Sequence, residues 1–175
     1  MILTIGITSY NRVNELERCL RSIDTKYDDD IEVLVSEDCS PLHSEIERMV
    51  LNLNAELIYD IRFCSNENNL GYDRNLGEII KKAQGHFVLL MSCDDMLYPN
   101  QLDNIINVLK NNQKCGLLYL SYIYGNTKKL DRFHSSNLLI EASFRNAGIY
   151  IYDSILFSGL IFNKEYIKDI YATRF

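Results

Sequence analysis

Residues 86–99 read HFVLLMSCDDMLYP, and this stretch decides the predicted fold. Phe87 to Ser92 form a short, mainly apolar run, which is typical of a strand buried on both faces of a sheet. Two adjacent carboxylates, Asp94 and Asp95, follow almost at once. Like charges so close together are unfavourable unless water, a basic side chain or a cation compensates them. The stretch therefore predicts a buried strand that ends at a polar site.

The N-terminal part of the chain repeats this order of strand, polar turn and helix. Apolar and β-branched runs predict strands over residues 2–8, 31–36, 57–63 and 87–92. Apolar residues at helical spacing predict helices over residues 14–23, 42–54, 73–85 and 99–112, with Gly85 as a C-terminal cap and Pro99 in a first turn. Strands that alternate with helices indicate an α/β fold with a mostly parallel sheet and helices on both faces.

The pattern becomes weaker after Gly116. The sequence favours strands over 117–125 and 154–163, a short helix over 139–148 and a final helix over 164–175. No internal repeat, low-complexity linker or clear boundary divides the chain, so we expect a single domain over residues 1–175.

Composition excludes several classes of protein. The chain has 175 residues and a net charge of -6, and a general nucleic-acid-binding protein would need a basic face instead. Apolar runs such as FVLLM are too short to span a bilayer, and the N-terminus lacks the basic start of a signal peptide. The five cysteines are widely spaced without a CxxC motif, which argues against a zinc site or disulfides and favours a reducing cytoplasm.

Polar side chains gather just after the predicted strands. The turns read TSYNR (8–12), SEDCSP (36–41), NLGYDRN (69–75) and SCDD (92–95). In parallel sheets, ligands bind at the carboxyl ends of the strands, where these turns would meet. Together they could hold a nucleotide diphosphate and Mg²⁺ or Mn²⁺, which prefer oxygen ligands. The side chains concerned are Thr8, Tyr10, Arg12, Glu37, Asp38, Arg74, Asp94 and Asp95.

Several of these residues also have a plainer explanation. A pair such as Asp94 and Asp95 is, taken alone, more often a solvated turn, and only its place after a buried strand reverses that preference. Asp38 could select a base with a ring N–H, or it could serve as turn and cap chemistry. Tyr10 could stack on a base or lie in the core. Arg74 could pair with a diphosphate or be an exposed charge near a helix start, where the helix dipole disfavours it.

The sequence lacks the motifs of several other nucleotide-binding and hydrolytic folds. There is no GxxxxGK[ST], no GxGxxG after the first strand and no GxSxG. A nucleotidyltransferase would carry a Gly-rich loop where this chain has TSYNRVNE, and a receiver domain would carry its acidic pair after the first strand. The three histidines are far apart in sequence, so we assign them no role.

The four turns, in this order and spacing, resemble the family 2 glycosyltransferases of the GT-A (Rossmann-like) fold. The resemblance is carried by ILTIGITSYNR, IEVLVSEDCSP and NENNLGYDRNLGEIIKKAQGHFVLLMSCDD, and by the predicted helix that starts in YPNQLDNII. It covers residues 1–112 well and the remainder loosely. It implies a nucleotide-sugar-binding half over 1–112 and a partial acceptor-binding half over 113–175. The SEDCSP variant is most similar to bacterial enzymes that build polysaccharide or lipopolysaccharide.

The resemblance also implies residue roles. Thr8 and Tyr10 would line the base pocket with Asp38, and Arg74 would lie near the base and diphosphate, with Arg12 grouped among the nucleotide-binding residues. Asp94 would lie near the ribose and Asp95 would bind the metal, Mg²⁺ or Mn²⁺. The implied reaction is inverting transfer of a sugar from a UDP-, dTDP- or GDP-linked donor to a glycan or lipid-linked acceptor. That activity would be cytoplasmic, at the inner face of the membrane, and compatible with peripheral membrane association.

Two departures from the family pattern stand out. Many members carry an acidic residue where this chain has Ser92. An inverting enzyme also needs a general base, and the late acidic residues lack the motif that supplies it in the family. They are Glu141, Asp153, Glu165 and Asp169. We therefore expect a C-terminally truncated chain whose base lies beyond Phe175. The alternative function is a nucleotide-binding module or inactive fragment without that base.

Overall fold

The computed structural model describes residues 1–120, 122–124, 127–129 and 157–167. Its N-terminal part alternates strictly between strands and helices, as the periodicity predicts. The elements up to residue 111 are β1 (Leu3–Ser9), α1 (Val13–Arg21), η1 (Asp28–Asp30), β2 (Ile31–Glu37), α2 (His43–Glu56), β3 (Ile61–Ser65), α3 (Tyr72–Lys82), β4 (Phe87–Ser92) and α4 (Leu102–Asn111). Those after it are β5 (Leu117–Tyr119), β6 (Tyr122–Tyr124), β7 (Thr127–Lys129), η2 (Phe157–Gly159), β8 (Leu160–Asn163) and η3 (Lys164–Tyr166).

The main sheet is mostly parallel, which confirms the predicted fold class. Its strand order is β3-β2-β1-β4-β8-β5, and β1 pairs in parallel with both β2 and β4. β3 extends the parallel part beside β2, whereas β8 runs antiparallel to β4 and β5 runs antiparallel to β8. β1 therefore lies at the centre of the four parallel strands, which explains why every residue in it is buried.

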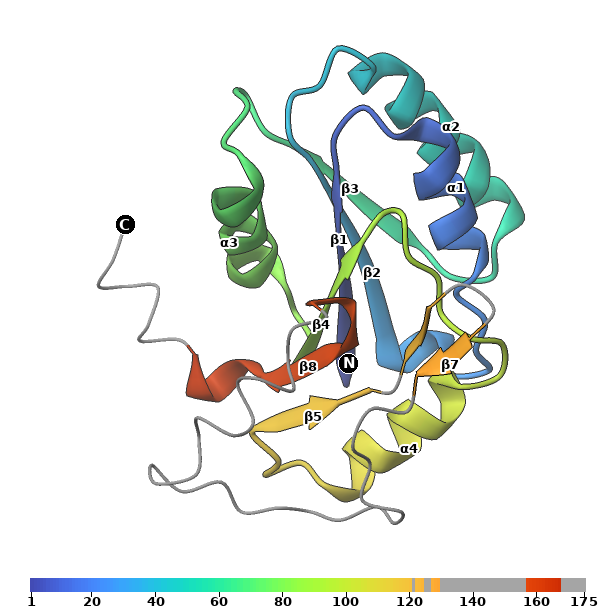
Figure 1. Ribbon diagram of the computed structural model, residues 1–175, viewed down its shortest axis with the longest axis vertical. Helices are drawn as coiled ribbons and strands as arrows, with labels where there is room; N and C mark the ends of the chain where they lie inside the picture. Colours follow the sequence, from blue (N-terminus) through green and yellow to red (C-terminus); the bar gives the residue numbers. More distant parts are fainter. Residues whose placement is uncertain (121, 125–126, 130–156, 168–175) are drawn as a thin grey trace.

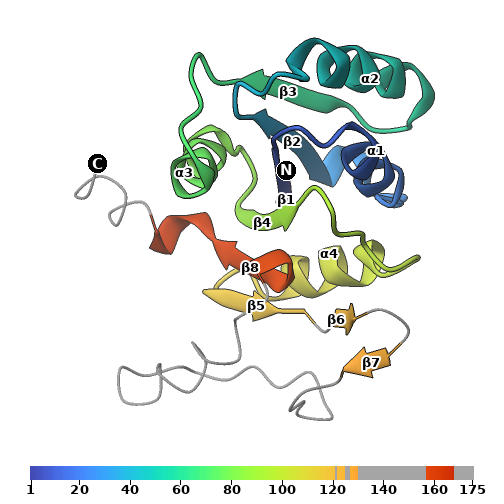
Figure 2. The same cartoon turned by 45° about the horizontal axis from the view of Figure 1, so that its top comes forward.

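Helices cover both faces of this sheet, as predicted (Figures 1 and 2). Residues at alternate positions of β1, such as Ile5 and Ile7, join the core formed with α1, α2 and α4. The opposite face packs against α3, where Ile79 approaches Gly6 so closely that a Cβ there would lie 2.2 Å from Ile79 Cγ2. Gly6 is therefore needed to let α3 lie flat on the centre of the sheet.

Some predicted boundaries are wrong for identifiable reasons. β3 begins at Ile61, not at residue 57, because the Asn54 side chain bonds both the N–H and the carbonyl of Ile61 and holds the preceding residues in a turn. Pro99 lies before α4, whose first residue is Leu102. Gly85 is not a helix cap, since α3 ends at Lys82, but its Cβ position lies 2.4 Å from the backbone N of Thr4. Glycine is required there by close backbone approach.

The C-terminal part completes the same sheet. β8 lies between β4 and β5, and its Ile161 is fully buried beside Leu89 and Leu118. The strand predicted over 117–125 is instead two short strands, and the described start of the predicted final helix is the 3₁₀ turn η3. The helix predicted over 139–148 lies outside the described residues. Within the described residues, no helix combines the length and apolar character needed to cross a membrane.

Candidate functional site

The strand register brings the polar turns to one edge of the sheet. Thr8, the next-to-last residue of β1, lies beside Ser36 of β2 on one side and Ser92 of β4 on the other. The carboxyl ends of these strands are therefore level with one another, and the turns that follow them leave from the same edge (Figure 1). Thr8 itself is only 7% exposed, so it forms part of the floor of this edge.

The turn after β4 presents its two carboxylates differently. Asp94 is exposed and Asp95 is half-buried. The Ser92 hydroxyl donates a hydrogen bond to Asp94 Oδ1, while the backbone N–H of Asp95 donates to the Ser92 carbonyl at 3.2 Å. Arg18 reaches the Asp94 backbone carbonyl at 3.3 Å and contacts no carboxylate oxygen there. The Ser92 hydroxyl thus orients the Asp94 carboxylate, and Arg18 does not neutralise its charge.

A residue from the C-terminal part holds the second carboxylate. Ser158, in η2, donates its hydroxyl to Asp95 Oδ2 and accepts a hydrogen bond from the Ser92 backbone N–H at 3.0 Å. Reasoning from the sequence alone did not identify Ser158, because 63 residues separate it from Asp95. The available signal was its place at the start of SGLIFNKEYI (158–167), which resembles the family segment that precedes the general-base motif but gave Ser158 itself no role.

The turn after β2 is built around Asp38, which is 4% exposed. Asp38 Oδ1 accepts from the Asn66 amide at 2.8 Å and from the Leu70 N–H at 2.9 Å, while Oδ2 accepts from the Gly71 N–H at 2.9 Å. A carboxylate oxygen has two lone pairs, so Oδ2 keeps one acceptor position. Asp38 therefore ties the loop between β3 and α3 to the end of β2 and retains limited capacity for a ligand.

Glu37 does not belong to the polar edge with which it was grouped. Its side chain is fully buried, and its carboxylate accepts from the backbone N–H groups of Ser40, at 2.8 Å, and Cys39, at 3.1 Å. His43 Nδ1 lies 3.0 Å from the same carboxylate. Glu37 shapes the turn from within, and His43, to which no role was assigned, supports it.

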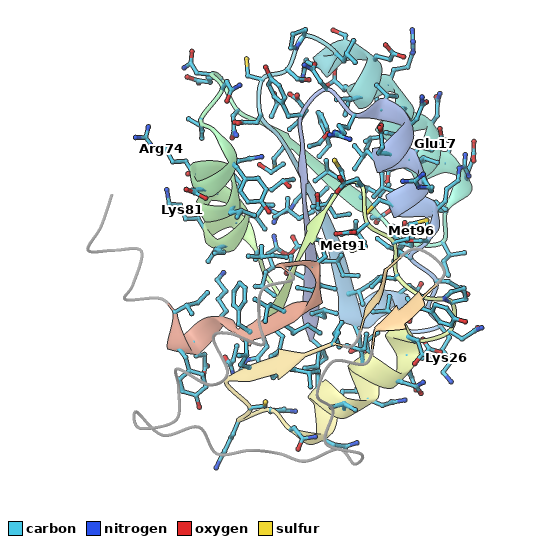
Figure 3. The ribbon with its side chains drawn as sticks, viewed as in Figure 1. Glu17, Lys26, Arg74, Lys81, Met91 and Met96 are labelled. Atoms are coloured by element: carbon cyan, nitrogen blue, oxygen red, sulfur yellow. The ribbon has the colours of Figure 1, made fainter. Side chains whose placement is uncertain are left out.

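The motif NLGYDRN points Asn75 inward and Arg74 outward. Asn75 is 2% exposed, and its side chain bonds the Ser36 hydroxyl at 2.6 Å, the Ser36 carbonyl at 3.1 Å and the Asn66 amide at 2.9 Å. Arg74 extends from α3 on the side away from the sheet (Figure 3). The structure therefore does not bring Arg74 together with the other predicted residues, and Asn75 is the member of the motif that joins the strand ends.

Tyr10 and Arg12 lie in the turn after β1. Tyr10 is 43% exposed, which leaves its ring accessible. Arg12 pairs with Glu15 at 3.5 Å, and its side chain remains 51% exposed. Burial, with the nearby charge of Asp94, raises the pKa of Cys93 to about 11, and the charge of Arg12 opposes this shift. The Arg12 guanidinium is thus within electrostatic reach of the turn after β4.

Tyr72, the first residue of α3, is a further neighbour of the acidic pair that was missed. Burial raises the pKa of its phenol, and the charge of Asp94 is the next cause, with smaller contributions that include Asp95. The ring is nevertheless 54% exposed at the surface. Tyr72, at the start of α3 and partly exposed, therefore lies within electrostatic reach of the carboxylate pair.

The donor set after β4 fits a divalent metal only together with a ligand. Among the described residues no group of three or more His, Cys, Asp or Glu side chains could enclose an ion. Mg²⁺ and Mn²⁺, however, are commonly held by one or two carboxylates, with substrate phosphates completing the shell. Asp94 and Asp95 each keep one carboxylate oxygen without a hydrogen bond from the described residues. The residues present thus suit a metal bound jointly with a diphosphate.

Glu165, one of the late acidic residues, lies far from this edge. β8 is antiparallel to β4 and pairs Asn163 with Phe87, so the chain leaves β8 at the amino end of β4. The length of β4, at about 3.3 Å per residue, therefore separates Glu165 from the carboxylate pair. The other late acidic residues, Glu141, Asp153 and Asp169, lie outside the described residues.

Comparison with known proteins gives one matching family. The family described as glycosyl transferase family 2 matches residues 4–170. An uncharacterised glycosyltransferase of Haemophilus influenzae is 27% identical over 120 residues, which cover 67% of this chain and 38% of the relative. The abequosyltransferase RfbV of Salmonella typhimurium is 33% identical over 106 residues, covering 58% of this chain and 31% of that protein. The chain thus spans less than half the length of these relatives.

Solved structures share the fold. S. aureus TarS 1-349 in complex with UDP-GlcNAc superimposes with a TM-score of 0.72 at 20% identity, over 97% of this chain and 47% of that one. The mannosyltransferase PcManGT from Pyrobaculum calidifontis, in complex with GDP-Man and Mn²⁺, gives a TM-score of 0.57 at 18% identity, over 67% of this chain and 34% of that one. With a GT-A-like sheet, polar strand ends at one edge and a family match over nearly its whole length, the chain belongs to glycosyl transferase family 2.

Proposed function

We propose that this chain is the donor-binding part of an inverting, metal-dependent glycosyltransferase of surface polysaccharide synthesis. It would transfer a sugar from a nucleotide diphosphate to a glycan or glycolipid acceptor on the cytoplasmic side of the membrane. The observation that carries this proposal is the acidic pair after β4, in which each carboxylate keeps one oxygen without a hydrogen bond from the described residues, close to the end of β1. Further support comes from the structural neighbours, of which one contains UDP-GlcNAc and another contains GDP-Man and Mn²⁺.

The base would lie over the ends of β1 and β2. Asp38 Oδ2 would accept a hydrogen bond from a ring N–H of uracil, thymine or guanine, since one of its lone pairs has no hydrogen bond from the described residues. The exposed Tyr10 ring would stack on the base. Ser9 and Ser40 each bury a hydroxyl that has no partner among the described residues, and a polar ligand at this edge would provide one.

The diphosphate would lie over the end of β4. Asp95, with Asp94 beside the ribose, would hold Mg²⁺ or Mn²⁺, which supplies Lewis-acid stabilisation of the leaving diphosphate when bound. Arg12 would add positive charge from the turn after β1. Arg74 would contribute only if its side chain turned from the outer side of α3 toward the strand ends.

Calorimetric titration of the chain with UDP, GDP and dTDP, each with and without Mn²⁺, tests the proposal. We expect one nucleotide to bind, and to bind more tightly with Mn²⁺. If none of the three binds under either condition, the nucleotide site is disproved. Metal-dependent binding without sugar transfer, even in a longer chain that continues past Phe175, would identify the alternative function of a binding module.

A further inference from the structure

We propose that Ser158 is a positioning residue for Asp95, and that the segment which forms η2 and β8 is thereby part of the metal site. This inference rests on the proposed function. Ser158 donates its only hydroxyl proton to Asp95 Oδ2 and accepts the Ser92 N–H at 3.0 Å, so it links the last backbone amide of β4 to the carboxylate. One oxygen of Asp95 is held in this way, while Oδ1 accepts no hydrogen bond from the described residues and is left for a cation.

A neutral donor suits this position for an electrostatic reason. Asp94 and Asp95 repel each other, so without a partner their side chains would tend to point apart. A lysine or arginine partner would order them but would also cancel the charge that attracts a dication. A serine hydroxyl fixes the direction of the carboxylate without adding charge. Ser92 does the same for Asp94 Oδ1, so each carboxylate of the pair has one oxygen held by a serine.

The residues that follow Ser158 are held in place by backbone pairing and packing. The carbonyl of the next residue, Gly159, accepts the Leu120 N–H at 2.7 Å, and β8 begins immediately afterwards. Ile161 is then fully buried between β4 and β5. A ligand whose hydrogen-bond partner is fixed by packing loses less freedom when a metal binds, and removing such partners commonly lowers metal affinity by about 10- to 100-fold.

The test measures Mn²⁺ binding and not activity. The wild-type protein, Ser158→Ala, Ser158→Thr and the exposed control Ser44→Ala are saturated with whichever of UDP, GDP or dTDP the wild type binds. Free Mn²⁺ is then followed by electron paramagnetic resonance. We expect Ser158→Ala to bind Mn²⁺ about 10-fold or more weakly. Ser158→Thr, which keeps the hydroxyl, should stay close to wild type, and Ser44→Ala should match it.

Two further measurements separate positioning from folding. Metal-free nucleotide affinity should be the same in Ser158→Ala and wild type, and the melting temperature should fall only modestly, because the Ser92 N–H loses one acceptor. If the alanine variant does not fold, Ser158→Cys is used, since it is nearly isosteric but a weak donor, and it should bind Mn²⁺ more weakly. If the folded alanine or cysteine variant binds Mn²⁺ as tightly as the wild type, the role of Ser158 is overturned and the proposed function is not affected. If the wild type binds no nucleotide with Mn²⁺, the proposed function fails and the inference fails with it.

Discussion

Two strands of the sheet end in an acidic pair next to a cysteine, yet the two pairs differ in almost every physical respect. After β2, Glu37 is fully buried, Asp38 is 4% exposed, and both accept hydrogen bonds from backbone N–H groups. After β4, Asp94 is exposed, Asp95 is half-buried, and the described residues donate only serine hydroxyls to them. The first pair orders the surrounding turn and loop, whereas each carboxylate of the second keeps one oxygen without a hydrogen bond from the described residues.

The difference teaches that burial, and not residue type, assigns a carboxylate its role. A buried carboxylate must be satisfied by the protein itself, because an unpaired buried charge is very costly. The loop between β3 and α3 folds back over Asp38 and provides those donors. No such loop covers the turn after β4 in the described structure. The predictions below test this contrast, starting with the largest expected effect.

Removing the Asp38 carboxylate should destabilise the fold much more than removing Asp94. Asp38→Ala deprives the N–H groups of Leu70 and Gly71 and the amide of Asn66 of an acceptor, which we expect to cost about 3 kcal/mol of unfolding free energy. Asp94→Ala removes an exposed charge and should change it by less than about 0.5 kcal/mol. Urea denaturation of the two variants measures both values, and equal losses would contradict the contrast.

Metal-dependent ligand binding should instead depend on the acidic pair after β4. Asp95→Asn keeps the shape of the side chain but halves the charge of the pair, and we expect Mn²⁺ affinity in the presence of nucleotide to fall about 30-fold, or about 2 kcal/mol. Its melting temperature should equal that of the wild type or exceed it slightly, because like-charge repulsion is removed. Glu17→Gln on the exposed face of α1 is the charge-matched control (Figure 3). Unchanged Mn²⁺ binding in Asp95→Asn would disprove the proposed metal site.

The thiol beneath the turn after β4 should couple stability to alkaline pH. Burial, followed by the proximity of Cys93 and Asp95, raises the pKa of Cys19 from 9.0 to about 12. The unfolded chain therefore loses this proton first as the pH rises. The contribution of Cys19 is complete below pH 9 and is lost toward pH 12, at about 1.4 kcal/mol per pH unit.

Chemical denaturation between about pH 9 and 10.5 checks this coupling. Stability should fall less steeply with pH in Cys19→Ala than in the wild type, whatever the absolute stability of the variant. Cys39→Ala, which removes an exposed thiol from the turn after β2, is the matched control for cysteine removal. Identical slopes in all the proteins would show that the buried thiol does not contribute.

The smallest effect concerns backbone strain in the turn after β2. Cys39 has a φ of 54°, in the left-handed region that disfavours side chains with a Cβ. Cys39→Gly should therefore raise the unfolding free energy by about 0.5 kcal/mol, after the greater entropy of glycine in the unfolded chain is deducted. Gly71→Ala, at a φ of 81° with open space around the added Cβ, should lower it by about 1 kcal/mol. Thermal unfolding of both variants tests the sign of each effect.

Part of the fold and of the site could be predicted from local patterns. The apolar run of β4 was located at its observed bounds, and the alternation with helices was enough to predict a parallel sheet. The antiparallel insertion of β8 was not predicted, because strand direction and neighbour depend on where the intervening chain returns. Thr8, Asp38, Asp94 and Asp95 were correctly expected at a common edge, since parallel strands end together.

What the sequence by itself determined is the first four strands, their parallel direction and the edge at which polar groups collect, since periodicity and turn composition are local properties of the chain. Only the tertiary structure decided which carboxylates are enclosed and which stay open. It also turned Asn75 inward in place of Arg74 and brought Ser158 to Asp95. Burial and hydrogen-bond satisfaction depend on contacts between residues far apart in sequence, and no local pattern contains them.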